Sequence, residues 1–207
     1  MSRFLAGLLL LPGLQVAMAD PTSEFWDWFA ANEDRVGAEP YGPETSEDLA
    51  YWLARIAPGL SYEIRRGGRK SVLTLSSDGE LRLFPIVDRL VEAAPRIRGW
   101  KVVSLRRRVK SPQAESTAGV TLNPADLYFD LYEDAGRFGV VFYLPVFDPG
   151  SMKDYRTAAM RLMSQSVGER EVGAWIGFVD FDSQNVRDME FSRPFKDFRE
   201  VFDGLRK

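Results

Sequence analysis

Two arginine-rich segments contain the residues best suited to chemistry in this sequence. The first, at a predicted hairpin turn, is Arg65-Arg66-Gly67-Gly68-Arg69-Lys70, and the second is Arg106-Arg107-Arg108-Val109-Lys110. Guanidinium groups donate paired hydrogen bonds to phosphate and carboxylate oxygens, and the amides of a turn can add further donors. The sequence therefore indicates an anion-binding site, and its candidate residues are Arg65, Arg66, Arg106 and Arg108.

The spacing of these arginines limits which of them can act together. Adjacent residues of a strand point to opposite faces, so Arg66 can share a face with Arg106 or Arg108. By the same rule, Arg65 can share a face with Arg107. The competing interpretation is that both segments are solvated strand ends, whose charges keep a sheet edge from pairing with other chains.

The composition narrows the chemistry further. The chain has 207 residues with no histidine and no cysteine, and its formal net charge is −3. It therefore contains no Ser-His or Cys-His nucleophile pair and no thiolate or imidazole ligand for a transition metal. A mildly acidic chain also lacks the basic excess that general nucleic-acid binding needs. We expect no catalytic residues, no metal, no cofactor and no nucleic-acid partner.

Carboxylates are the main acid-base groups that remain. The alternative function that they suggest is a hydrolase, for which Asp180 and Asp182 would have to share a cleft and one would need a raised pKa. The same segment offers oxygen ligands of the kind that Ca²⁺ prefers. It does not fit an EF-hand loop, however, because Asn185 and Phe191 stand where that loop has glycine and glutamate.

An aromatic segment near the start, Phe25-Trp26-Asp27-Trp28-Phe29, suggests a contact surface. Its side chains are spread around a predicted helix, so they cannot all face one core. We expect one side to pack on a sheet, and Trp26 or Trp28 to lie at an interface. The alternative is ordinary core packing with one ring exposed.

The periodicity of apolar residues and the turn residues define the elements that position these side chains. Helices are expected at 23–36, 45–56, 85–94, 151–167 and 195–205. Ser23, Thr45 and Ser151 are the expected N-caps of the first, second and fourth of these helices. Strands are expected at 60–65, 71–76, 100–105, 127–131, 138–144 and 172–178. Residues 111–118 are small and polar, which is typical of a loop.

This order of elements predicts an α+β fold. Two successive strand-strand-helix-strand units form antiparallel sheet with helices packed on it, preceded by two helices and followed by one. We expect residues 20–207 to form one domain with two similar halves, at about 60–110 and 119–207, because the connection between them is short.

Residues 1–19 have the pattern of a secretory signal peptide. Arg3 is followed by an apolar run from Phe4 to Val16 and by Ala17-Met18-Ala19, in which small residues occupy the positions that a signal peptidase reads. The run is too short to span a membrane. This interpretation places the mature protein in the periplasm or outside the cell. The alternative is a misassigned upstream start, with translation beginning at Met18 in the cytoplasm.

Three motifs in the first half of the chain carry a resemblance. They are Phe25-x-x-Trp28-Phe29, Leu75-x-x-x-Gly79 and Val87-x-x-Leu90-Val91-x-x-Ala94-Pro95-x-x-x-Gly99-Trp100. Together they resemble a group of uncharacterised bacterial proteins that open close to an F-W-x-W-F segment. The members of this group have no established activity, so the resemblance supplies no catalytic residues for this chain. Several members start just before the aromatic segment without a leader, which agrees with a start at Met18.

These observations favour a non-catalytic α+β binding or interaction protein, exported if Met1 is the true start. Its expected partner is another protein or a small anionic ligand, and no membrane span is expected in the mature chain. The alternatives are the carboxylate-based hydrolase and a small cytosolic regulator or immunity-type protein that begins at Met18.

Overall fold

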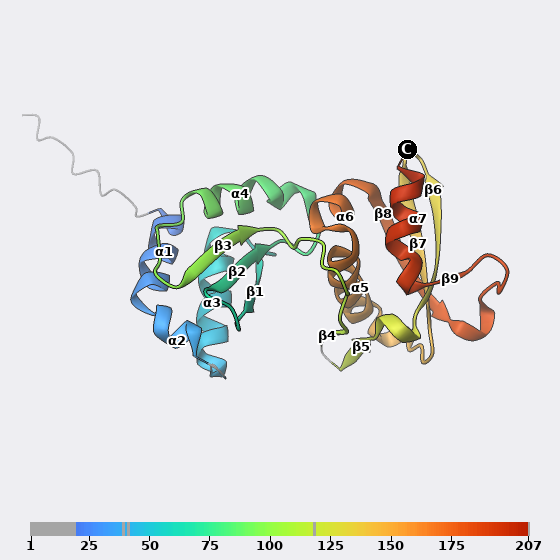
Figure 1. Cartoon of the computed structure of the whole chain (residues 1–207), viewed down its shortest axis with the longest axis horizontal. Helices are drawn as coiled ribbons and strands as arrows, with labels where there is room; N and C mark the ends of the chain where they lie inside the picture. The colour runs from blue at the N-terminus through green and yellow to red at the C-terminus, as the bar shows by residue number, and fades with distance from the viewer. Residues whose placement is uncertain (1–19, 39, 41, 118, 207) are drawn as a thin grey trace, which may run out of the picture.

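The computed structural model describes residues 20–38, 40, 42–117 and 119–206. They form two lobes side by side (Figure 1). The N-terminal lobe runs from residue 20 to 104, the C-terminal lobe from 115 to 206, and residues 105–114 connect them. The predicted signal peptide lies outside the described residues.

The N-terminal lobe begins with three helices and continues with a three-stranded sheet. The helices are α1 (Pro21–Ala31), α2 (Glu33–Gly37) and α3 (Pro43–Ile56), and α4 (Phe84–Glu92) lies between the last two strands. The strands are β1 (Ser61–Arg65), β2 (Ser71–Ser76) and β3 (Trp100–Ser104), in the spatial order β1-β2-β3. The N-caps predicted for α1 and α3, Ser23 and Thr45, are wrong. The Asp20 side chain caps α1, and α3 begins at Pro43, which leaves Thr45 buried inside the helix.

One face of this sheet is buried and the other is not. Leu73 and Leu75 of β2 are fully buried against side chains of α1, α3 and α4. Val72 and Thr74, which alternate with them, point to the opposite face and are only half-buried. This alternation leaves an open sheet face for the rest of the molecule to use.

A short hairpin that the sequence did not predict opens the C-terminal lobe. Strands β4 (Glu115–Thr117) and β5 (Val120–Leu122) pair antiparallel and pack on α5. Its strands are three residues long, and β4 is polar, so the periodicity in this region is too brief to distinguish a strand from a loop.

The C-terminal lobe continues with a four-stranded sheet. Its strands are β6 (Tyr128–Asp134), β7 (Arg137–Leu144), β8 (Ile176–Ser183) and β9 (Arg193–Pro194), in the order β8-β7-β6-β9. Its helices are α5 (Met152–Val167), α6 (Glu169–Trp175) and α7 (Phe198–Leu205). Short 3₁₀ helices occupy Leu81–Leu83, Pro124–Asp126, Pro149–Ser151, Gln184–Val186 and Phe195–Asp197.

The strand predicted at 172–178 is half wrong. Val172 and Ala174 belong to α6, and the strand begins only at Ile176. Alternating apolar residues favoured a strand here, but Val172 is buried in the core of the C-terminal lobe and Gly173 lies against Phe84 of the other lobe. Tertiary packing therefore determines the helical conformation of this segment.

The two lobes share one topology, which confirms the predicted α+β class. In each, an antiparallel hairpin (β1-β2 or β6-β7) leads through helix to a third strand, β3 or β8, that pairs parallel with the second strand. The β1-β2-β3 sheet and the β8-β7-β6-β9 sheet are therefore mixed, where the sequence had suggested antiparallel pairing throughout. Each lobe has its own hydrophobic core. None of the helices in the described ranges is long and apolar enough to cross a membrane.

Candidate functional site

The lobes meet at the carboxylate of Glu169, the first residue of α6, which is fully buried. It accepts hydrogen bonds from the amides of Ser77 and Arg106, both at 2.9 Å, and of Gly79 at 3.2 Å. The Ser76 hydroxyl lies 2.9 and 2.8 Å from its two oxygens. A single side chain of the C-terminal lobe thus binds two chain segments that leave the N-terminal sheet, at the ends of β2 and β3.

Backbone geometry aims these donors at Glu169. Asp78, in the turn after β2, and Leu105, directly after β3, both have left-handed backbones with φ of 50° and 57°. Such conformations cost about 1–3 kcal/mol for residues other than glycine and persist only where the surroundings enforce them. Here they flank the amides that bind Glu169.

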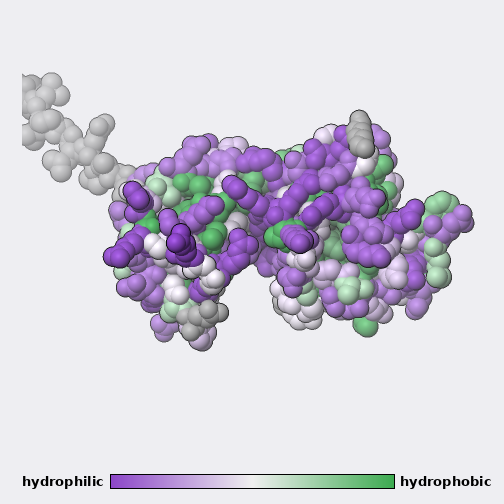
Figure 2. Space-filling view, viewed as in Figure 1, coloured by the Kyte–Doolittle hydropathy of each residue, from purple (hydrophilic) through white to green (hydrophobic). Residues whose placement is uncertain are grey.

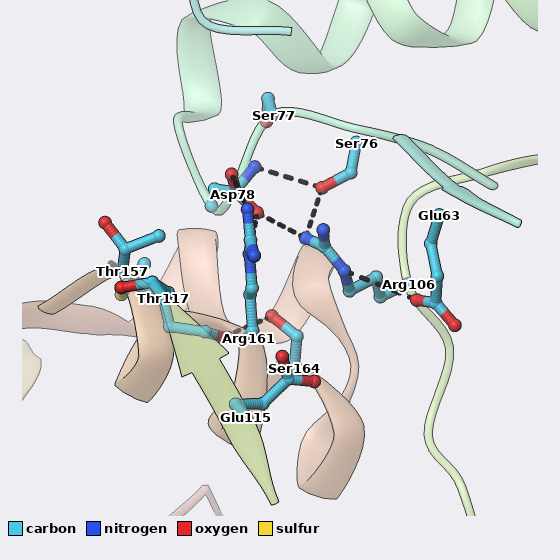
Figure 3. Close-up of polar contacts among 12 residues, drawn as sticks. Glu63, Ser76, Ser77, Asp78, Arg106, Glu115, Thr117, Thr157, Arg161 and Ser164 are labelled. Carbon is cyan, nitrogen blue, oxygen red and sulfur yellow. Dashed lines mark hydrogen bonds and ion pairs between the residues drawn. The ribbon is translucent and has the colours of Figure 1, made fainter. Parts of the chain in front are cut away.

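Asp78 lies between two guanidinium groups from opposite sides of the contact (Figure 3). Its carboxylate is 2.5 Å from Arg106 Nη1 and 3.3 Å from Arg161 Nε of α5. Burial alone would raise the pKa of Asp78, but the charges and hydrogen bonds of the two arginines outweigh it and lower the pKa below its ordinary value. We call the set Ser76, Ser77, Asp78, Arg106, Arg161 and Glu169 the lobe joint.

A cavity of about 610 Å³ lies beside the lobe joint. Its floor is the open face of the N-terminal sheet, where Arg65, Val72 and Lys101 are neighbours on β1, β2 and β3. Its wall is the connecting segment with Glu115 and Gln165 of the C-terminal lobe. We call this cavity the basic groove, because five cations line it against two carboxylates: Arg65, Lys101, Arg106, Arg107 and Arg108 against Glu63 and Glu115.

Three of the five cations are available to a ligand. Arg65, Lys101 and Arg107 are exposed, and none of them forms an ion pair with any residue that the structure describes. Burial raises the pKa of Glu115, although the Gln165 side chain donates a hydrogen bond to its carboxylate. A carboxylate with a raised pKa is protonated, and so loses its negative charge, at a higher pH than an exposed one.

The structure distributes the predicted arginines unequally. Arg65, Arg106 and Arg108 all line the basic groove, as does Arg107. Arg106 is buried in the lobe joint, and Arg108 forms a 2.7 Å ion pair with Asp203 of α7.

Arg66 does not line this groove. Its guanidinium donates to the carbonyls of Val36 and Gly37 instead, so it ties the hairpin to α2. Lys101 was missed by the sequence analysis, because one lysine in an otherwise apolar strand has no distinguishing pattern.

The predicted tryptophans lie in or next to the core of the N-terminal lobe. Trp26 is 3% exposed, and its Nε1 donates to the carbonyl of Leu90 in α4 at 2.9 Å. Trp28 is half-buried beside Trp52, and the Arg35 guanidinium lies 5.8 Å from its ring centroid. Trp28 is thus the more accessible of the two to a partner.

Asp180 and Asp182 lie within β8 and not after it. Both side chains are exposed on the open face of the C-terminal sheet, and neither lines the basic groove. The hydrolase alternative requires the two side chains to share a cleft, whereas here both are exposed on the sheet face. In the described part of the chain, acidic residues nowhere cluster in a way that could hold a metal ion.

A second cavity, of about 770 Å³, lies on the other side of Asp78, between the turn after β2 and helix α5 with strand β8. Its charged lining residues balance, with Asp78 and Glu80 against Lys153 and Arg156. It therefore favours no sign of ligand charge, whereas the basic groove does.

No protein-family model, no curated protein and no solved structure matches this chain.

Proposed function

We propose that this protein is a non-catalytic binding protein that holds a small anionic ligand in the basic groove. The observation that carries the proposal is the row Arg65, Val72 and Lys101 on the floor of a groove that Arg107 also lines. These cations have no carboxylate partners in the described structure, so an anion would supply the missing counter-charge.

The groove also suggests the class of ligand. A cavity of about 610 Å³ falls in the range of small-molecule sites, about 300–1,000 Å³. Val72, Val103 and Leu105 provide an apolar floor between the charges. An organic phosphate or carboxylate with a compact apolar body would contact both parts of this lining, and pyrophosphate would contact the charged part alone.

Pyrophosphate, titrated by calorimetry, tests the anion site. We expect saturable binding that weakens on raising NaCl from about 25 to about 250 mM, because the Debye length, beyond which exposed charges are screened, falls from about 20 Å to about 6 Å over this range. The double variant Arg65→Ser with Arg107→Ser should weaken binding by about tenfold or more.

A matched control separates the groove from net charge. Arg96 and Arg98 are exposed on the same lobe, outside the groove, and have no ion-pair partner among the residues described. Arg96→Ser with Arg98→Ser removes the same charge and should leave the affinity within about twofold. Equal losses in both double variants, or no saturable binding by the wild type, would leave the arginines as solvated strand ends.

The proposal extends to the location of the protein. With the signal-peptide pattern of residues 1–19, we expect an exported mature chain that begins at Asp20. Sequencing the N-terminus of the native protein decides this point. A chain beginning at Met18 would place the same binding activity in the cytoplasm.

A further inference from the structure

The open face of the C-terminal sheet presents a regular pattern of rings and carboxylates. Strand pairing places its side chains in three rows across β6, β7 and β8. The rows are Tyr132-Gly139-Phe178, Asp130-Val141-Asp180 and Tyr128-Tyr143-Asp182. We call these nine residues the acidic face.

Helices do not cover this face. The side chains that alternate with it, such as Phe138, Val140 and Phe142, are buried in the core with residues of α5 and α7. On the acidic face, by contrast, Tyr132 is 43% exposed and Phe178 is 38% exposed. A sheet therefore separates a helix-covered face from one that is open to solvent.

The glycine in the first row makes room for an aromatic platform of two rings. A Cβ atom at Gly139 would lie 2.5 Å from the Phe178 ring and 2.9 Å from the Tyr132 ring. The two rings close over this glycine and contact each other edge to face, with centroids 5.6 Å apart. Their exposed surfaces form a site where a cation can lie against π electrons.

The carboxylates of the second and third rows lack cationic partners. Asp130 accepts a hydrogen bond from the Tyr143 hydroxyl at 2.7 Å, and its other oxygen is buried without a partner. Among the residues described, Asp180 and Asp182 accept hydrogen bonds only from the backbone amides that follow them. None of the three forms an ion pair within the described ranges.

Arg137, on the same strand as Val141, forms no ion pair with these carboxylates in the described ranges. The Arg137 guanidinium donates to the carbonyls of Gly173 and Ile176 and is thereby held away from the carboxylates. Burial and the Asp130 hydrogen bond raise the pKa of Tyr143 to about 12, so its phenol stays a neutral donor at physiological pH. The face therefore has three negative charges and two accessible rings.

The chain already binds one guanidinium at the edge of this face. Arg187, in the loop after β8, places its guanidinium carbon 3.9 Å from the centroid of the Tyr128 ring. The same loop protrudes beyond the sheet (Figure 1) and exposes Val186, Met189 and Phe191 by 62%, 80% and 70%. Figure 2 shows hydrophobic surface, in green, on this protrusion at the right of the view. Exposed apolar side chains next to polar and charged groups are typical of protein contact surfaces.

We propose that the acidic face is a docking surface for a partner protein that presents an arginine-rich segment. Charge complementarity identifies the partner: an arginine lying over Val141 lies between Asp130 and Asp180 and beside the platform of Tyr132 and Phe178. Carboxylates alone would accept lysine equally well. The rings favour arginine, whose planar guanidinium stacks on aromatic faces.

The test uses hexa-arginine amide and hexa-lysine amide as probes of the whole protein, with affinity measured by fluorescence anisotropy. The wild type should bind hexa-arginine about threefold or more tightly than hexa-lysine. Asp180→Asn with Asp182→Asn should weaken hexa-arginine binding about tenfold, and Tyr132→Leu with Phe178→Leu should remove the preference for arginine. Amide chemical-shift changes should centre on Val141 and its neighbours.

Asp27→Asn with Asp34→Asn provides the matched control. Both residues are exposed on the N-terminal lobe, and this variant loses the same two charges. It should leave the affinity within about twofold. The proposal is overturned if the two double variants weaken binding equally, or if wild type shows no preference for arginine. It is also overturned if sedimentation shows a dimer that the Asp180 and Asp182 substitutions dissociate, because a second copy would then occupy the face.

Discussion

The open faces of the two lobes occupy equivalent places in one topology and have opposite charges. In the N-terminal sheet, Arg65 and Lys101 flank Val72 of the middle strand. In the C-terminal sheet, Asp130 and Asp180 flank Val141 of the middle strand. Each valine is thus a neutral centre between two like charges.

The difference shows that the strand-strand-helix-strand unit fixes which side of the sheet stays open but not the charge of that side. In both lobes, helices bury one side of the sheet and the other side remains available. Since residues on an open face contribute little to the core, their charge can change without loss of the fold. Their surroundings also differ: the lobe joint closes one side of the basic groove, whereas the acidic face is fully open.

Breaking the lobe joint should have the largest effect. In Glu169→Gln, an NH₂ group replaces one carboxylate oxygen and cannot accept the hydrogen bonds that the backbone amides donate there. We therefore expect the free energy of unfolding to fall by about 3–5 kcal/mol. Urea denaturation measures this change. As a control, Glu171→Gln in the same helix removes a partly exposed ion pair with Arg206 and should cost less than about 1 kcal/mol. Equal costs would show that Glu169 does not hold the lobes together.

The ion pairs of Asp78 should make part of the stability depend on pH. The pKa of Asp78 is lowered in the folded protein, so its contribution is complete above its unfolded pKa of about 3.9 and is lost as pH falls through the folded value. We expect the free energy of unfolding of the wild type to exceed that of Asp78→Asn by about 1.5–3 kcal/mol at about pH 6, and the gap to shrink as the pH falls below about 3.9. Urea unfolding across this range measures the gap, and a constant gap would contradict the assignment.

Converting the N-terminal face into a copy of the acidic face tests the comparison itself. Arg65→Asp with Lys101→Asp places carboxylates on either side of Val72. We expect pyrophosphate affinity to fall about tenfold and hexa-arginine affinity to rise, with thermal stability changed only slightly. Arg96→Asp with Arg98→Asp should do neither. A variant that unfolds would show that the charges on this face are structural.

Much of the fold could be predicted because its determinants are local. The helix at 45–56 and the hairpin at 60–76 follow from apolar spacing and from glycines in turns, and both exist as α3 and as β1 with β2. The failure at 172–175 has a non-local cause, because that segment is helical where it packs against the other lobe at Gly173. The parallel pairing of β3 with β2 and of β8 with β7 likewise depends on the whole sheet and not on any one segment.

The candidate site was only partly predictable for the same reason. Arg65 and Arg106 were conspicuous in runs of arginine. Only the folded chain shows that Arg106 forms an ion pair with Asp78, and that Lys101 lines the same groove as Arg65. Glu169 gave no indication in the sequence. A lone glutamate at a helix start is ordinary, and its donors lie 63 to 93 residues away.

That separation has a consequence for how the protein is made. The N-terminal lobe leaves the ribosome first, and Arg106 precedes Glu169 by 63 residues. At about 5–20 residues per second, the carboxylate follows the Arg106 amide by about 3–13 s. The nascent N-terminal lobe can therefore complete its core while the donors for Glu169 still face water. The contact of Glu169 with these donors therefore forms late, and only once the start of α6 has been synthesised.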